Sequence, residues 1–130
     1  AIRLLMMIDD IKEFFDRFVD DFSSFNGTLI ASRYRAPYLA VSSDGDIWEC
    51  AARPELVEYF QSLLDKHLED GVTCCKYQDL ETYSIGKSCF SASVTWTMMN
   101  KSGETVSTWR ESYNLIRTDD GLKIFTSIDH

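Results

Sequence analysis

The chain has 130 residues, a length typical of one domain. It carries 13 basic and 21 acidic residues, and the resulting net charge of −8 argues against nucleic acid and anionic membrane surfaces as partners. Apolar residues make up 45% and aromatic residues 13%, which excludes disorder, and no stretch approaches the roughly 20 apolar residues of a membrane span. We therefore expect a single soluble domain over residues 1–130, with a core or pocket that receives its many aromatic side chains.

The cysteines and histidines do not predict a metal site. The chain has no Cys-x-x-Cys pair and only two histidines, so we expect no zinc, no other metal and no cofactor. The apolar segment 2–8 is short, lacks a cleavage site and runs directly into Asp9 and Asp10, which argues against a signal peptide. We expect reduced thiols in a cytoplasmic protein; the four cysteines are Cys50, Cys74, Cys75 and Cys89.

A helical period of three and four residues opens the chain. It predicts an amphipathic helix over residues 8–25, which Asn26-Gly27 would stop, and a short helical turn over residues 28–34. Pro37 then restricts Ala36 to an extended conformation. The apolar positions of the first helix are Ile8, Ile11, Phe15, Phe18, Phe22 and Phe25.

A hairpin and a second long helix come next. Residues 38–42 and 47–50 are typical of two short strands joined by an Asp-Gly turn at 43–46. Pro54 suits the first position of a helix, and Gly71 suits its end. The apolar stripe of this helix holds Leu56, Phe60, Leu63, Leu64 and, on the same side, His67.

After Gly71 the period changes to two. The alternation and the abundance of Val, Thr, Ile, Tyr and Trp predict four long antiparallel strands, over residues 72–85, 88–100, 104–118 and 122–129. Helices segregated to one side of such a sheet make an α+β fold. Long twisted strands curl, so we expect a cone with an open mouth, a shape that binds small ligands.

Three segments carry a resemblance to a known family. The segments are Tyr34-Arg35-Ala36-Pro37-Tyr38, the helix that begins Pro54-Glu55-Leu56, and the run from Trp109 to Ile124 with its Asp-Gly turn. They resemble the NTF2-like superfamily, which includes SnoaL-like cyclases and ketosteroid isomerases. The resemblance covers nearly the whole chain. It implies a cone-shaped, cystatin-like α+β fold with N-terminal helices packed on a strongly curved antiparallel sheet. It says little about function, because this superfamily hosts enzymes, binding modules and assembly domains.

The resemblance also tests possible catalytic roles. The isomerases use a tyrosine donor, a carboxylate base and a protonated carboxyl donor. Counting along the motifs places the tyrosine donor at Phe18 and the base at Ser42 or Ser43, with Asp44 one residue later. The same count places the carboxyl donor at Tyr113. One role of the three is retained, by Tyr113. The cyclases use a His–Asp pair, for which His67 and His130 are the candidates. If the last strand reaches the mouth of the cone, Asp129 and His130 would form such a pair at its rim.

Strand parity assigns the two faces of the sheet. We expect Trp109, Glu111, Tyr113 and Leu115 on the concave face, because the pocket position of the family aligns with Tyr113. A carboxyl group between Trp109 and Tyr113 would have a raised pKa and could accept a proton; the alternative for Glu111 is an ion pair with an arginine such as Arg33 or Arg35. Trp96 lies on the concave side, or at an interface if the parity is reversed.

Two classes of function follow. The first is a small-molecule-binding domain, with or without acid/base isomerase or lyase activity, in which Glu111, Tyr113 and Asp44 are catalytic candidates. The alternative is a non-catalytic binding or assembly module. For both classes of function, the resemblance favours a homodimer formed through the Ser/Thr-rich convex face of the sheet. The expected ligand-binding residues are Phe18, Tyr34, Tyr38, Trp48, Phe60, His67, Trp96 and Trp109.

Overall fold

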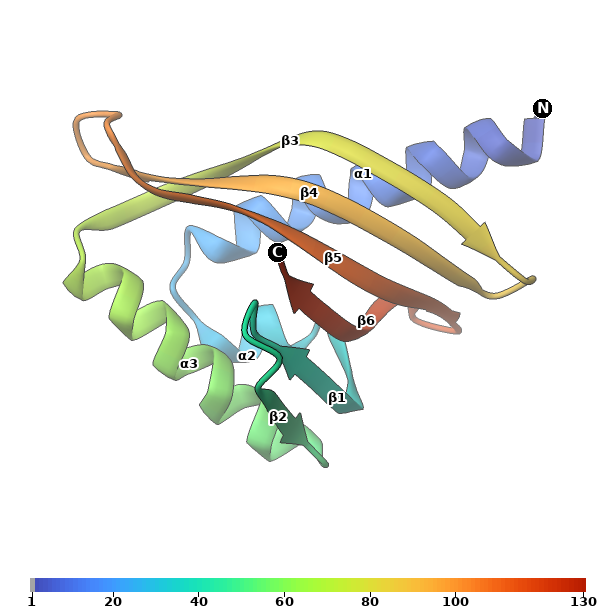
Figure 1. Ribbon diagram of the computed structural model, residues 1–130, viewed down its shortest axis with the longest axis horizontal. Helices are drawn as coiled ribbons and strands as arrows, with labels where there is room; N and C mark the ends of the chain where they lie inside the picture. Colours follow the sequence, from blue (N-terminus) through green and yellow to red (C-terminus); the bar gives the residue numbers. More distant parts are fainter. Residues whose placement is uncertain (1) are drawn as a thin grey trace.

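The computed structural model describes residues 2–130, with side chains from residue 4 onward. Residues 2–130 form three helices and six strands in the order expected from the sequence, and Figure 1 shows how they are arranged in space. The elements are α1 (Ile2–Phe22), α2 (Gly27–Ala31), β1 (Tyr34–Val41), β2 (Ile47–Cys50), α3 (Arg53–Glu69), β3 (Val72–Ile85), β4 (Cys89–Asn100), β5 (Thr105–Thr118) and β6 (Gly121–Asp129).

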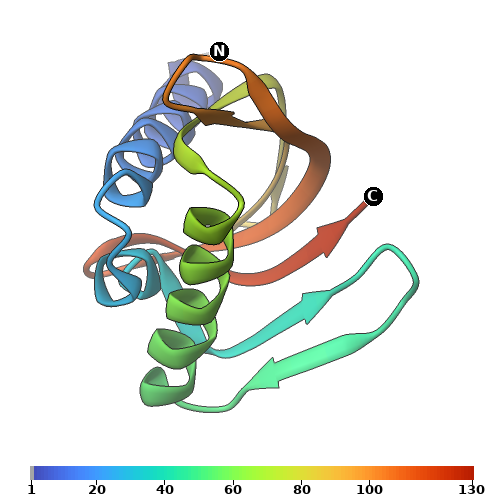
Figure 2. The same ribbon diagram turned by 90° about the vertical axis from the view of Figure 1, so that its left-hand side faces the viewer.

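All six strands form one curved sheet in the order β2-β1-β6-β5-β4-β3. The last four strands are antiparallel neighbours, as predicted, but β1 lies parallel to β6, so the sheet is mixed. Figure 2 shows the strands curling from α1 round to the β1–β2 hairpin, with α3 on their inner side. The α+β, cystatin-like architecture is therefore confirmed, and the parallel pair is a detail that hairpin signals cannot reveal.

The helix boundaries differ from the prediction at three points. α1 begins at Ile2 and ends at Phe22, whereas the sequence pattern indicated 8–25. Asn26 does not stop that helix; its side chain accepts a hydrogen bond from the Thr28 N–H and caps the start of α2. Gly27 is the first residue of α2, where an added Cβ would lie 2.8 Å from Gln61, so this glycine permits close packing of α2 on α3.

The first strand is longer than expected. β1 begins at Tyr34, whereas the prediction began at Tyr38. The Ala36–Pro37 peptide bond is cis and falls where the register of β1 with β6 shifts. The bounds of α3 and of β3 to β6 agree with the prediction to within about one residue at each end.

The core lies between α1 and the inner face of the sheet. Phe15 and Trp96 are both essentially inaccessible, with ring centroids 6.1 Å apart, and each also contacts Tyr77. The helical stripe therefore packs on the inward positions of β4, as the two periodicities predicted. No helix within residues 2–130 combines the length and apolarity required to cross a membrane.

Candidate functional site

The inner face of the sheet encloses a cavity of about 800 Å³ between α3, α1 and the β1–β2 hairpin. Its walls are mainly aromatic, and a few polar groups converge on them, which is the usual make-up of a small-molecule site. The aromatic residues that line it are Phe18, Phe22, Tyr34, Tyr38, Trp48, Tyr59, Phe60, Trp96, Trp109 and Tyr113.

Of the catalytic and binding candidates named from the sequence, the structure leaves Ser43, Asp44 and His130 outside the cavity lining and brings the others together. Both Glu111 and Tyr113 line the cavity, and so does every residue expected to bind ligand. Asp44 instead lies exposed on the turn between β1 and β2. Asp46, two residues further along the same turn, is the residue that reaches the cavity.

Glu111 projects from β5 into the cavity, and no side chain among residues 4–130 gives it a basic partner. The Trp109 indole N–H donates a hydrogen bond to its Oε1 at 2.8 Å. Arg33 and Arg110 are engaged elsewhere, with Asp21 at 2.6 Å and Glu81 at 2.7 Å. Burial raises the pKa of Glu111 to about 7, although hydrogen bonds from Trp109 and Tyr113 act in the opposite direction.

Asp129 on β6 lies directly across from Glu111. The two residues are register partners in the β5–β6 pair, so their side chains share the inner face, and both line the cavity. Their carboxyl groups are joined by a hydrogen bond, and burial raises the pKa of Asp129 as well. Two neighbouring carboxyls cannot both ionise freely, so the pair tends to hold one proton.

Tyr113 and Trp96 form a second polar contact in the cavity wall. The Trp96 indole N–H donates to the Tyr113 hydroxyl oxygen at 2.7 Å, which leaves the hydroxyl proton of Tyr113 available to another acceptor. Tyr113 is buried and lies two residues after Glu111 on the same face of β5. A carboxyl and a phenol therefore act on the same part of the cavity.

Further tyrosines extend the polar lining. The hydroxyl groups of Tyr38 and Ser127 share a hydrogen bond, and both side chains are buried. Burial raises the pKa of Tyr34 and of Tyr38 well above their ordinary value, and that of Tyr59 to about 12. These phenols are therefore neutral donors at physiological pH.

His67 lies half-buried on α3 with its ring parallel to that of Trp109. The two ring centroids are 6.1 Å apart with an angle of 6° between the planes. Burial lowers the pKa of His67, so the imidazole is mainly neutral near pH 7. The sequence pattern placed His67 on the inward stripe of its helix, and the structure agrees.

The cavity also contains residues that the sequence reasoning missed. Ser127 was not singled out, and Asp129 was considered only as a partner of His130. Asp46, Lys66 and Asp70 also line the cavity. Strand alternation could have placed Ser127 and Asp129 inward with the β5–β6 register, but the turn and helix-end residues carried no periodic signal.

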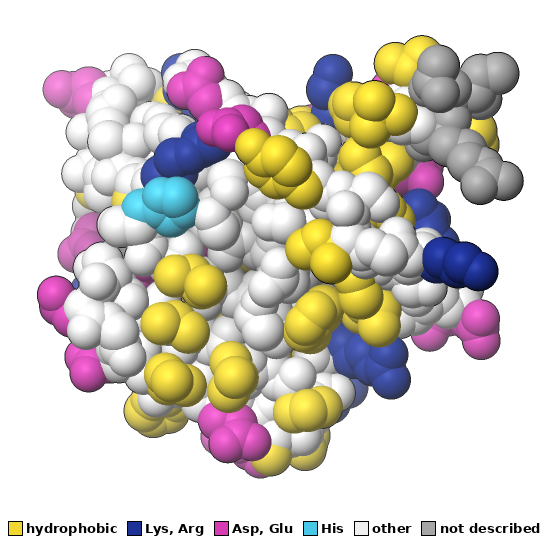
Figure 3. Space-filling model, turned by 45° about the vertical axis from the view of Figure 1, so that its right-hand side comes forward, with side chains coloured by type: hydrophobic (Ala, Val, Ile, Leu, Met, Phe, Trp, Pro, Cys, Tyr) yellow, Lys and Arg dark blue, Asp and Glu magenta, His cyan; other side chains and the backbone are white. Residues whose placement is uncertain are grey.

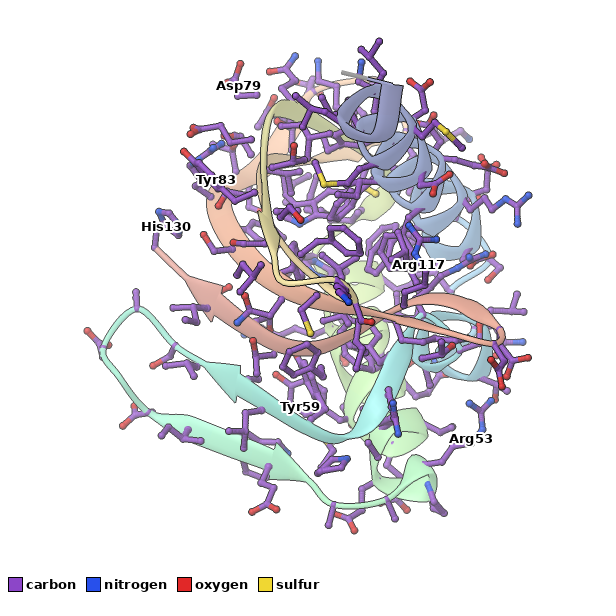
Figure 4. The ribbon with its side chains drawn as sticks, turned by 90° about the vertical axis from the view of Figure 1, so that its right-hand side faces the viewer. Arg53, Tyr59, Asp79, Tyr83, Arg117 and His130 are labelled. Carbon is purple, nitrogen blue, oxygen red and sulfur yellow. The ribbon has the colours of Figure 1, made fainter. Side chains whose placement is uncertain are left out.

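The outer face of the sheet has a different chemistry. Ser112 lies within 2.6 Å of both the Ser93 hydroxyl and His130 Nε2, so His130 does not pair with Asp129 in the cavity. Figure 4 shows His130, Asp79 and Tyr83 at the outer side of the curved strands. Figure 3 shows a face of the molecule on which hydrophobic side chains lie in separate groups among basic and acidic ones.

Comparisons with known proteins agree on the fold. No curated protein matches the chain. Aln2 from a Streptomyces species has a similar structure, with a TM-score of 0.77, 12% identity, and coverage of 96% of this chain and 90% of that one. An NTF2-like protein with a cystatin-like fold from Novosphingobium aromaticivorans has a TM-score of 0.75 and 13% identity, with coverage of 98% of this chain and 83% of that one. An NTF2-like protein of unknown function from Shewanella oneidensis has a TM-score of 0.75 and 12% identity, with coverage of 94% of this chain and 97% of that one.

At such low identities these structures show a shared fold and nothing about activity. The family assignment comes from a sequence model described as NTF2-like protein (DUF6841), which matches residues 9–130. Because this match spans nearly all of the chain, the protein belongs to that NTF2-like family.

Proposed function

We propose that the protein binds a compact, largely apolar small molecule and performs acid/base chemistry on it. The observation that carries the proposal is the Glu111 carboxyl, which lies in an aromatic cavity and has a pKa of about 7. A group that is partly ionised near neutral pH can both take and return a proton. The substrate would carry a carbonyl or hydroxyl group.

The geometry supports a defined division of roles. Glu111 would take a proton from the carbon next to a substrate carbonyl, and the Tyr113 hydroxyl would donate a hydrogen bond to the oxygen on which negative charge develops. The Trp96 N–H bond to the Tyr113 oxygen strengthens that donor. Return of the proton to another carbon completes an isomerisation; loss of a β-hydroxyl, protonated as it leaves, completes an elimination.

Hydrogen exchange tests this proposal without knowledge of the natural substrate. The probe is 2-tetralone in D₂O, with loss of its α-proton signals followed by NMR. The protein should accelerate exchange, with a rate that rises as the pH passes about 7. Glu111→Gln should reduce the acceleration on the order of 100-fold or more, and Tyr113→Phe by roughly tenfold or more.

The matched control is Glu58→Gln on the exposed side of α3, which removes the same charge outside the cavity. This variant should exchange the ketone at the wild-type rate. Circular dichroism would establish that all variants are folded. Wild-type exchange by a folded Glu111→Gln variant would refute the assignment of the base.

A second candidate function is an assembly module that dimerises through the outer face of the sheet. The observation that favours it is a set of exposed apolar side chains among the Ser and Thr residues of that face: Tyr83, Ile85 and Ile128 are 62%, 54% and 44% exposed. Apolar groups spread on a broad β-sheet suit a sheet-on-sheet contact.

Analytical ultracentrifugation distinguishes a monomer from this dimer by mass. A dimer would have twice the 15.0 kDa mass of the chain at micromolar concentration. Tyr83→Glu should dissociate it, whereas Leu68→Glu, at an exposed position of α3, should not. A species of single-chain mass in the wild-type protein would remove this candidate.

A further inference from the structure

We propose that the ligand of this cavity is an organic ammonium, with an apolar body among the aromatic walls and its cationic group at the mouth beside Asp129. The inference deepens the proposed function, on which it rests, by naming the substrate class of the same cavity. It is carried by the charge balance of the lining, the nature of the walls and the pairing of two carboxyls.

The carboxyl groups of the cavity have no cationic partner of their own. Glu111, Asp129, Asp46 and Asp70 all line it, against a single lysine, Lys66, which is exposed on α3. The ion pairs found among the described side chains engage other carboxylates. A cavity with this lining repels an anionic ligand and favours a cation.

The walls suit the same ligand. An ammonium group is attracted to the faces of tryptophan and tyrosine rings, most strongly where it has lost water. Trp48 stacks on Tyr59 near the mouth, with centroids 6.2 Å apart and an angle of 26° between the planes. Trp48 is 62% exposed, so a large ring face lies where a ligand would enter.

The hydrogen-bonded pair of Glu111 and Asp129 links the charge of the ligand to the chemistry. A cation beside Asp129 favours the ionised form of both carboxyls, because each then gains an attractive charge in place of the shared proton. Binding would release part of a proton to solvent and leave Glu111 as the carboxylate. The substrate would thus convert Glu111 into the base that the proposed reaction requires.

Apart from Lys66, the tyrosine, histidine and cysteine side chains that line the cavity supply no positive charge to this pair. Tyr34 and Tyr38 from β1, Tyr59 from α3 and Tyr113 from β5 all have a raised pKa and stay neutral, and the pKa of His67 is lowered. The raised pKa of Cys75, on β3, also keeps its thiol neutral. His130 lies outside the cavity, and its proximity lowers the pKa of Asp129, against the larger effect of burial.

Three naphthalene probes of similar size test the inference by calorimetry at pH 7: 2-naphthylmethylammonium, 2-naphthalenemethanol and 2-naphthoate. We expect the ammonium to bind at least about tenfold more tightly than the alcohol, and the carboxylate more weakly than either. Added salt should weaken the ammonium alone. Binding heats in buffers of different ionisation enthalpy should show partial proton release for the ammonium.

Variants locate the cationic group. Asp129→Asn should weaken the ammonium about tenfold and change the alcohol less than twofold. Glu69→Gln, near the same end of α3 as Asp70 but outside the cavity lining, removes the same charge and should change neither. If Asp129→Asn fails to fold, salt dependence and proton release of the wild-type protein still decide the point.

Equal binding of ammonium and alcohol, or absence of binding by all three probes, would overturn the inference. Failure of the proposed function looks different: ammonium selectivity would persist, while ketone exchange would be absent or insensitive to Glu111→Gln. Ketone exchange that depends on Glu111, together with no preference for the ammonium, would sustain the proposed function and reject the ligand class.

Discussion

The two faces of the sheet give glutamate side chains opposite surroundings. On the outer face, Glu81 of β3 pairs with Arg110 at 2.7 Å and is exposed to solvent. On the inner face, Glu111 lies next to Arg110 in sequence, yet its side chain points into the cavity and finds an indole N–H and another carboxyl. One step along β5 therefore separates a solvated ion pair from an unpaired acid.

This difference is the reason that the proposed chemistry is assigned to the inner face. Pairing and solvent stabilise the charge of Glu81, whereas the aromatic surroundings of Glu111 oppose ionisation. A buried carboxyl without a cationic partner lowers the stability of the fold. Groups of this kind are found mostly at functional sites, which makes Glu111 a candidate. The following predictions test how far the two faces differ.

The largest effect is expected in the inner wall. Trp96 is 1% exposed, packs on Phe15 and Phe18, and donates to Tyr113. Trp96→Ala should lower the free energy of unfolding by about 3–5 kcal/mol, measured by urea denaturation. Thr95→Ala, one residue away on the outer face, should cost about 1 kcal/mol through the lost Arg110 contact; an equal cost for both would refute the contrast.

Next in size is the pH dependence contributed by Glu111. Its pKa rises from 4.5 to about 7 on folding, so between these values the folded chain holds more protons than the unfolded chain. The stabilisation is complete below pH 4.5 and is lost as the pH rises through 7. In urea denaturation, the free energy of unfolding of the wild-type protein should fall by about 3 kcal/mol more than that of Glu111→Gln between about pH 4.5 and 8; an equal decline in both would contradict the raised pKa.

The smallest effect is expected at the outer ion pair. A double-mutant cycle with Glu81→Gln and Arg110→Ala should give a coupling energy below about 1 kcal/mol in urea denaturation, reduced further by about 1 M salt. Arg110 also donates to the Asp79 carbonyl and to Thr95, so its single variant should cost more than that of Glu81. A coupling of several kcal/mol would mean that the outer face is as desolvated as the cavity.

Alternation along single strands, together with the resemblance, predicted much of the inner face. The period of two grouped Glu111 with Tyr113, the resemblance named that face as the concave one, and the structure places both residues at the cavity with Trp96. The helical period likewise identified the buried stripe of α1, although Leu4 and Leu5 at its start are exposed and the pattern was not followed back to Ile2. Such predictions succeed because each depends on neighbours within a few residues.

Features that depend on distant pairing were not predictable in this way. The meeting of Glu111 with Asp129 requires the β5–β6 register, and the parallel alignment of β1 with β6 brings together segments more than 80 residues apart. The placement of Asp46 rather than Asp44 at the cavity depends on the exact path of a turn.

The place of β6 in the sheet has a consequence for how the protein forms during synthesis. This strand joins the β1–β2 hairpin to the other three strands and supplies both Ser127 and Asp129 to the cavity. Until β6 has left the ribosome, the hairpin has no partner strand on its inner edge and the cavity lacks one wall. The nascent chain must therefore carry its aromatic surfaces partly uncovered until β6 has docked between β1 and β5.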